Sequence, residues 1–132
     1  MNSFYFRNGR PDINKIINDF LSIAHQYQIN IESIALVGGW ARAARDSGFD
    51  CNDEAANPID LQVFINKSSK YGGDVDFVIF LNDIEPNLES ILSKHLNADI
   101  QPEEKDGRID IVLSLPAKVR LPGIKLITNS AL

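Results

Sequence analysis

Cysteine, methionine and tryptophan each occur only once in this chain, and long apolar runs are missing. The lone Cys51 cannot form a disulfide within the chain. The longest apolar stretches, such as IALV and VIFL, fall far short of the roughly 20 residues that a membrane-spanning helix needs. No apolar signal segment follows the few basic residues near the N-terminus. We therefore expect a cytoplasmic protein that neither crosses a membrane nor depends on an internal disulfide.

Positive charge is also scarce. The 132 residues include 13 Lys and Arg against 18 Asp and Glu, which gives a formal net charge of −5 at pH 7. Such a balance disfavours general binding to nucleic acids or to anionic membranes, although a local basic patch could still bind phosphate. With 44% hydrophobic residues, a chain of this length can build one core. We expect a single domain over residues 1–132.

Helical and strand-like patterns alternate along the chain. Apolar residues at helical spacing predict helices over 12–28, where Asp12 is the expected N-cap, and over 85–96. The helix formers of WARAARDS predict another at 40–47. Runs rich in β-branched and aromatic residues predict strands at 31–37, 59–65, 74–81, 109–115 and, at a sheet edge, 123–127. The expected fold class is α/β (α+β), a mixed β-sheet with helices packed on one face, in which 59–65 and 74–81 are candidates for a hairpin.

Three aspartates form the most informative pattern in the sequence. Asp74 and Asp76 are two apart in DVDFVIFL, so on a strand they would point to the same face. Asp110 lies near the start of another predicted strand. If the two strands are neighbours, the three carboxylates converge at one edge. Mg²⁺ is the cation that such oxygen ligands prefer, and a pair of Mg²⁺ ions supports phosphoryl or nucleotidyl transfer.

A pair of glycines ends the strand at 31–37 and precedes a predicted helix. Gly38 and Gly39 would let backbone N–H groups approach a phosphate, although an ordinary strand-to-helix turn accounts for them equally well. Arg42 and Arg45 share a face of that helix and could reach a phosphate tail, while a solvated face is the simpler interpretation. Trp40 is expected to pack in the core rather than to stack on a base.

These motifs occur in the order of a known family. LVGGWARAARDS resembles the glycine signature of the nucleotidyltransferase superfamily, in the GGW form of the minimal and aminoglycoside nucleotidyltransferases. DVDFVIFLND, a helix and then RIDIVLSLP are similar to the paired-acid strand, helix and third-acid strand of that family. The resemblance implies that Gly38 and Gly39 bind nucleotide phosphates. It also implies that Asp74, Asp76 and Asp110 coordinate Mg²⁺, with Asp110 placed to activate an acceptor hydroxyl.

The spacing departs from the family pattern, because 34 residues, 40 to 73, separate the glycine pair from Asp74. The segment 59–65 is expected to be an inserted strand. In an alternative alignment with the family pattern, Asp60 and Gln62 take the place of the two paired acids, and the second acid is then missing. Asp60 can also be interpreted as a charge at a strand end that faces water. Family order favours Asp74 and Asp76.

Two functions follow from these expectations. The first is an Mg²⁺-dependent nucleotidyltransferase that moves a nucleoside monophosphate from a nucleoside triphosphate to a hydroxyl of an unknown acceptor. So short a chain would complete its site with a second copy or a helical protein partner. The alternative is an inactive domain of the same fold that acts as a binding or antitoxin-like partner.

Several other reactive residues are expected to have no chemical role. His25 and His95 fall in predicted helices without metal-ligand spacing, and Cys51 has no recognisable base beside it. Arg108, two residues before Asp110, is a weak candidate for a phosphate contact.

Overall fold

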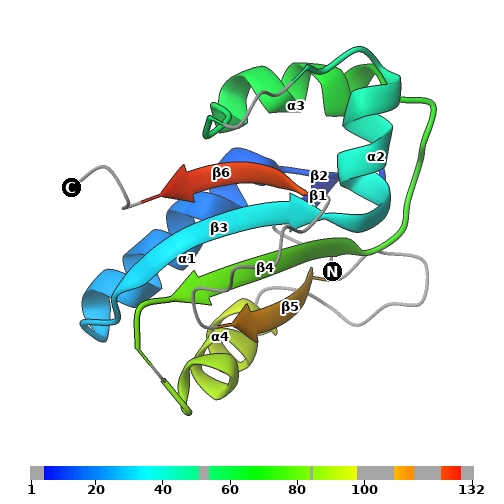
Figure 1. Ribbon diagram of the computed structural model, residues 1–132. Coiled ribbons are helices and arrows are strands. Elements are labelled where there is room, and N and C mark those ends of the chain that lie inside the picture. The colour runs from blue at the N-terminus through cyan, green and yellow to red at the C-terminus, as the bar shows by residue number, and fades with distance from the viewer. Residues whose placement is uncertain (1–4, 51–53, 84, 98–108, 115–122, 129–132) are drawn as a thin grey trace.

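A computed structural model describes residues 5–50, 54–83, 85–97, 109–114 and 123–128, the fourth of these ranges by its backbone only. The described chain is mixed α/β (Figure 1). Its helices are α1 (Ile13–Gln26), α2 (Gly38–Asp46), α3 (Pro58–Lys67) and α4 (Leu88–Asn97). Its strands are β1 (Phe6–Arg7), β2 (Arg10–Pro11), β3 (Ile31–Val37), β4 (Val75–Leu81), β5 (Ile109–Ser114) and β6 (Ile124–Thr128).

The main sheet has the strand order β5-β4-β3-β6. β3 pairs antiparallel with both β4 and β6, whereas β4 pairs parallel with β5, so the sheet is mixed. The expected neighbours 74–81 and 109–115 do lie side by side, and the strand expected at 123–127 is at an edge. A parallel pair needs a crossover between its strands, and α4 lies in that connection.

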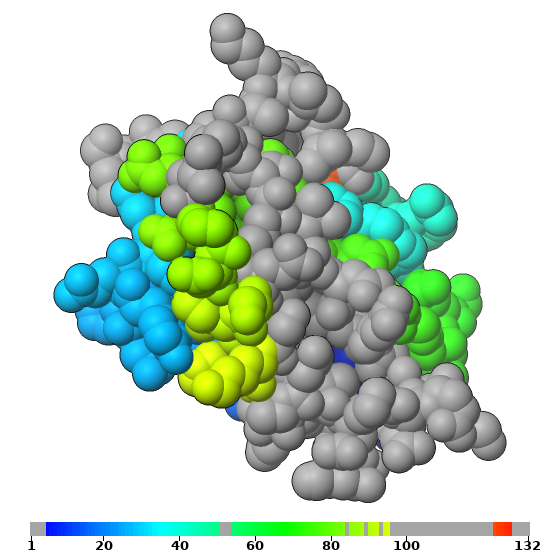
Figure 2. Space-filling view, turned by 90° about the horizontal axis from the view of Figure 1, so that it is seen from below, coloured from blue at the N-terminus to red at the C-terminus, as the bar shows by residue number. Residues whose placement is uncertain are grey.

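The core lies on one face of this sheet. Alternate residues of β4, namely Val75, Phe77, Ile79 and Leu81, are buried in the same hydrophobic cluster as the apolar faces of the four helices. Figure 2 shows α1 and α4 next to each other, and Tyr27 at the C-terminal end of α1 contacts His95 of α4. The expectation that helices cover one face of a mixed sheet is therefore confirmed.

The longest helix, α1, begins as its sequence predicts. Its N-cap is Asp12, whose carboxylate accepts a hydrogen bond from the Lys15 backbone N–H at 3.2 Å. The apolar side of the helix is buried, including Ile16 and Phe20, and the Phe20 ring meets Phe77 of β4 edge to face. This helix thus anchors the centre of the sheet.

The strand expected at 59–65 is wrong, because this segment forms the helix α3. Pro58 occupies the first turn, and the Asn57 side chain accepts a hydrogen bond from the Ile59 N–H at 2.8 Å, which caps the helix. Leu61 and Ile65, one turn apart, are fully buried. The expected hairpin between 59–65 and 74–81 is wrong for the same reason.

The short hairpin β1–β2 was not expected from the sequence. Asn8 and Gly9 form its turn with φ values of 54° and 74°, a conformation that Asn-Gly pairs favour. Three contacts attach it to residues of α3 and the segment 68–73 that follows. Gly72 N–H donates to the Gly9 carbonyl, the Arg10 guanidinium donates to the Ser68 carbonyl, and Gln62 donates to the Pro11 carbonyl.

Candidate functional site

The glycine pair lies where β3 passes directly into α2, with no residue between the strand and the helix. Gly38 has a φ of 74°, a conformation that a residue with a side chain rarely adopts. Val37 is the N-cap and offers no side-chain hydrogen bond to the first turn. The local backbone therefore needs a glycine at position 38, and Gly39 has no such requirement.

The side chain of Asp76 lies against this glycine. A Cβ atom placed on Gly38 would be only 2.5 Å from Oδ2 of Asp76. The strand register explains the approach, since Asp76 pairs with Val37, the residue just before Gly38. A negative charge is favourable near the N-terminus of α2, because the helix dipole is positive there. The structure thus brings together two of the residues that the sequence singled out.

The other two aspartates flank Asp76. Asp110 on β5 is its register partner across the parallel pair β4–β5, so the two backbones lie about 4.8 Å apart. The Asp110 side chain lies outside the part of the chain that is described. Asp74 is exposed in the residues just before β4 begins. The backbone arrangement therefore places all three positions at one end of neighbouring strands, beside the glycine pair.

A lysine that the sequence analysis did not single out also reaches this place. The Lys70 Nζ atom would lie 3.1 Å from a Cβ atom on Gly39 and 3.4 Å from one on Gly73. Its ammonium group is 5.3 Å from the centroid of the Trp40 ring, which is a cation–π distance. The ammonium therefore lies beside the backbone of the glycine pair.

Trp40 fixes the segment that carries Lys70. Its side chain is fully buried, which agrees with the expected core position. The indole N–H donates to the Gly73 carbonyl at 3.2 Å, next to Asp74. The first turn of α2 is thereby joined to the residues that lead into β4.

The two arginines of α2 are both exposed. Arg45 donates a hydrogen bond to the Gly123 carbonyl at 2.9 Å, just before β6. Among the described residues, no side-chain hydrogen bond or ion pair links Arg42 or Arg45 to the glycine pair. Their assignment to nucleotide binding stays a prediction.

The alternative acid pair has a different environment. Asp60 is exposed in the first turn of α3, where its charge suits the helix dipole. Gln62 hydrogen bonds to the backbone of Ile13 and Pro11 and to Asn66. Because the two residues lie on a helix and not on a strand, they do not form a pair on one strand face.

Among the side chains that can be described, no group of three or more His, Cys, Asp and Glu is arranged to hold a metal ion. Asp110 was not part of that search, since its side chain is not described. His25 is exposed, and Cys51 and Arg108 lie outside the described ranges. Asp74 and Asp76 nevertheless offer the hard oxygen ligands of a cation that takes one or two carboxylates together with substrate phosphates.

Within the described ranges, no helix has the length and apolar character required to cross a bilayer. Comparisons with protein-family models, with curated proteins and with solved structures find no match to this chain.

Proposed function

We propose that this protein is an Mg²⁺-dependent nucleotidyltransferase that transfers a nucleoside monophosphate from a nucleoside triphosphate to a hydroxyl acceptor. The observation that carries the proposal is the packing of the Asp76 carboxylate against Gly38, with Asp110 as the register partner of Asp76. It unites the glycine turn and the acid strand of the nucleotidyltransferase resemblance despite the intervening segment. The fold proposed is accordingly nucleotidyltransferase-like.

Each element of the site has a chemical role in this proposal. Gly38 and Gly39 would offer backbone N–H groups to the triphosphate at the N-terminus of α2. Lys70, whose ammonium lies beside Gly39, would neutralise phosphate charge there. Asp74, Asp76 and Asp110 would hold Mg²⁺, which stabilises the negative charge that develops on the phosphate during transfer. Arg42 and Arg45 would lie near the outermost phosphate, in contact with it or with the surrounding solvent.

The insertion is compatible with this arrangement. The segment 54–73 returns to the glycine pair through α3 and the loop that carries Lys70. Trp40 and Gly73 hold the end of that segment beside the first turn of α2. The added residues therefore leave the paired acids next to the glycines.

Titration calorimetry with ATP, in the presence and absence of Mg²⁺, tests the proposal. We expect the wild-type protein to bind ATP with Mg²⁺ and the double variant Asp74→Asn with Asp76→Asn to lose this binding. Asp60→Asn is the matched control, because it removes one exposed carboxylate on α3 and also tests the alternative acid pair. Binding that survives the double variant, or that is lost in Asp60→Asn, contradicts the assignment.

One observation favours the second candidate, an inactive domain of this fold that binds a protein partner. Ile59 and Val63, one turn apart on α3, are 62% and 47% exposed, and apolar pairs of this kind are common at interfaces. If the wild-type chain binds no ATP while Ile59→Asp with Val63→Asp abolishes a homodimer or a complex seen by sedimentation, the second candidate replaces the first.

A further inference from the structure

The segment 68–73 leads from the end of α3 toward β4 and carries Lys70. It forms neither helix nor strand, and its last two residues, Gly72 and Gly73, have φ values of 81° and 98°. A stretch with two successive glycines can adopt many conformations, so contacts with neighbouring elements must select one. The position of Lys70 therefore depends on what holds this segment.

Arg10 of β2 holds the segment on both sides of Lys70. Its Nη2 donates to the Ser68 carbonyl at 2.8 Å, and its guanidinium carbon lies 5.4 Å from the centroid of the Tyr71 ring, which is a cation–π distance. The Nε atom is buried, so the inner edge of the guanidinium is enclosed by protein. One side chain thus contacts the residues at positions 68 and 71.

Ser68 connects Arg10 to the backbone of Lys70. It is only 4% exposed, and its Oγ accepts a hydrogen bond from the Lys70 backbone N–H at 3.0 Å. The carbonyl of the same serine is the one that Arg10 binds. A displacement of Ser68 would therefore displace the Lys70 backbone as well.

The turn of the β1–β2 hairpin packs against the same segment. The Gly72 N–H donates to the Gly9 carbonyl at 2.8 Å. A Cβ atom placed on Gly9 would be 3.0 Å from the Gly72 nitrogen and 3.1 Å from Cε2 of Tyr71. The two backbones approach so closely that a side chain at position 9 would push them apart.

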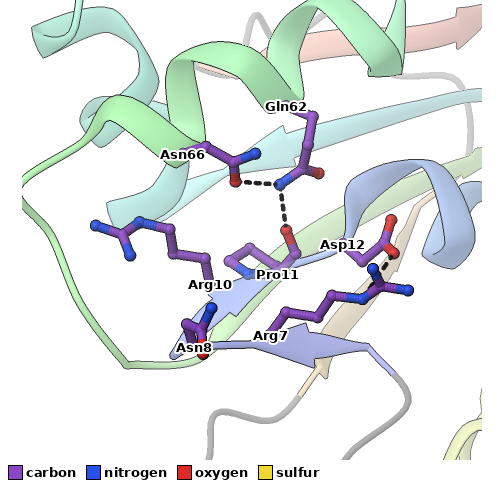
Figure 3. A pocket seen from close by; sticks show the side chains of 7 residues that line it. All are labelled: Arg7, Asn8, Arg10, Pro11, Asp12, Gln62 and Asn66. Atoms are coloured by element: carbon purple, nitrogen blue, oxygen red, sulfur yellow. Dashed lines mark hydrogen bonds and ion pairs between the residues drawn. The ribbon is translucent and has the colours of Figure 1, made fainter.

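The hairpin gives Arg10 a fixed base. Gln62 of α3 donates from Nε2 to the Pro11 carbonyl at 2.9 Å, a bond drawn in Figure 3, and its Oε1 accepts from the Ile13 N–H at 2.8 Å. Pro11 directly follows Arg10 in β2. The backbone from which Arg10 projects is therefore attached to α3.

The second arginine of the hairpin has a different environment. Arg7 is the register partner of Arg10, its side chain is 80% exposed, and its Nε lies 3.9 Å from Oδ2 of Asp12. Figure 3 shows the two guanidinium groups at opposite ends of the view, with Asp12 beside Arg7. The hairpin thus offers two arginines of equal charge, of which Arg10 contacts the segment 68–73.

We propose that Arg10 is a positioning residue of the nucleotide site. Through the backbone of Ser68 and the ring of Tyr71, it fixes the segment 68–73 so that the Lys70 ammonium stays beside the backbone of Gly39. The effect on nucleotide binding rests on the proposed function, whereas the placement of Lys70 does not. The N-terminal hairpin would then serve the site without touching the nucleotide.

The fluorescence of Trp40 tests the placement without any nucleotide. Trp40 is the single tryptophan, and the Lys70 ammonium is 5.3 Å from its ring centroid, so removal of this charge should change the emission. Lys70→Gln defines that change. We expect Arg10→Met, which keeps a long side chain but removes its donors, to shift the emission in the same direction. The same substitution should add no shift in the Lys70→Gln protein.

The matched control is Arg7→Met, which removes the same charge from the facing strand and should leave the emission as in the wild type. Tyr71→Leu is a second variant that should fold even if Arg10→Met does not, because the Tyr71 side chain is 68% exposed. Since it removes the ring beneath the guanidinium, we expect a smaller shift in the same direction.

Calorimetry with ATP and Mg²⁺ tests the consequence for the site. We expect Arg10→Met to raise the Kd about fivefold in the wild-type chain but less than about twofold in the Lys70→Gln protein, where the positioned group is already gone. A residue that only supports the fold would weaken binding equally in both proteins. Arg7→Met should bind ATP as the wild type does.

Four results overturn the positioning role. They are an unchanged emission in Lys70→Gln, an unchanged emission in both Arg10→Met and Tyr71→Leu, a shift in Arg7→Met as large as that in Arg10→Met, and equal effects of Arg10→Met with and without Lys70. A wild-type chain that binds no ATP while the emission shifts as expected contradicts the proposed function instead, and still supports Arg10 as the residue that positions Lys70.

Discussion

The Asp76 carboxylate fills the space beside Gly38 in which any larger residue would place its Cβ atom, at a separation of 2.5 Å from Oδ2. The contact joins the end of β3 to the start of β4 across their antiparallel register. Because the proposed phosphate-binding turn and the proposed metal ligand touch here, a substitution of either one should affect the other.

Replacing Gly38 with alanine should be strongly destabilising. The new Cβ atom would meet the carboxylate, and the φ of 74° is unfavourable for alanine, so we expect the free energy of unfolding to fall by about 2–4 kcal/mol. Urea denaturation followed by circular dichroism measures this loss.

Two other glycines serve as controls for that variant. Gly72 has a φ of 81° with open space around its Cβ position, so Gly72→Ala should lose only about 1 kcal/mol from backbone strain. Gly39 lies in the helix and would meet only the flexible end of Lys70, so Gly39→Ala should change stability by less than about 1 kcal/mol. Equal effects at positions 38 and 72 would show that Asp76 does not restrict the turn.

Trp40→Phe should destabilise the protein by about 1–3 kcal/mol, because it leaves a small cavity and removes the donor to the Gly73 carbonyl. Since this is the single tryptophan, unfolding is followed by circular dichroism instead of fluorescence. Ile59→Ala, on the exposed side of α3, is the control and should stay within about 0.5 kcal/mol of the wild type. A Trp40→Phe protein as stable as this control would contradict the role of the indole.

Lys70→Gln should weaken binding of ATP with Mg²⁺ about tenfold without lowering stability, since one charged contact to phosphate is lost. The calorimetric titration described above measures the change. The control is Lys67→Gln, which removes the same charge three residues earlier in the chain. The Lys67 ammonium lies over the Phe64 ring. If both variants bind ATP alike, the position of Lys70 beside Gly39 has no functional importance.

Gln62→Leu should lower the free energy of unfolding by about 2–3 kcal/mol, because three hydrogen bonds of this side chain are lost together. They join it to the backbone of Ile13 at the start of α1, to the backbone of Pro11 in β2 and to Asn66 within α3. Chemical denaturation measures it. Val63→Ala, the next residue on the same helix and half in solvent, should have an effect of less than about 0.5 kcal/mol. A stable Gln62→Leu protein would mean that other contacts hold the hairpin in place.

Local sequence signals predicted most of the helices and strands but failed at α3. Its β-branched and aromatic residues suggested a strand, and two helix signals outweighed them in the structure. Asn57 and Pro58 start the helix, and the spacing of Leu61 and Ile65 matches one helical turn. The Asn8-Gly9 pair was likewise a readable hairpin signal.

The candidate site was predictable only in part. The order of glycines and acids indicated where to look, and the parallel pairing of β4 and β5 then placed Asp110 opposite Asp76. Lys70 could not be found from sequence, because its position beside Gly39 depends on how the segment 68–73 folds back onto α2. That path is set by tertiary contacts such as the bond from Trp40 to Gly73.

The anchoring of the β1–β2 hairpin bears on the order in which the chain can fold during synthesis. Three hydrogen bonds join it to α3 and to the segment 68–73. Gln62 donates to the Pro11 carbonyl, Arg10 to the Ser68 carbonyl and the Gly72 N–H to the Gly9 carbonyl. An isolated two-stranded hairpin is at best marginally stable in water. The hairpin therefore completes these contacts only after residue 72 has been synthesised, and a pause in translation before that point would delay them.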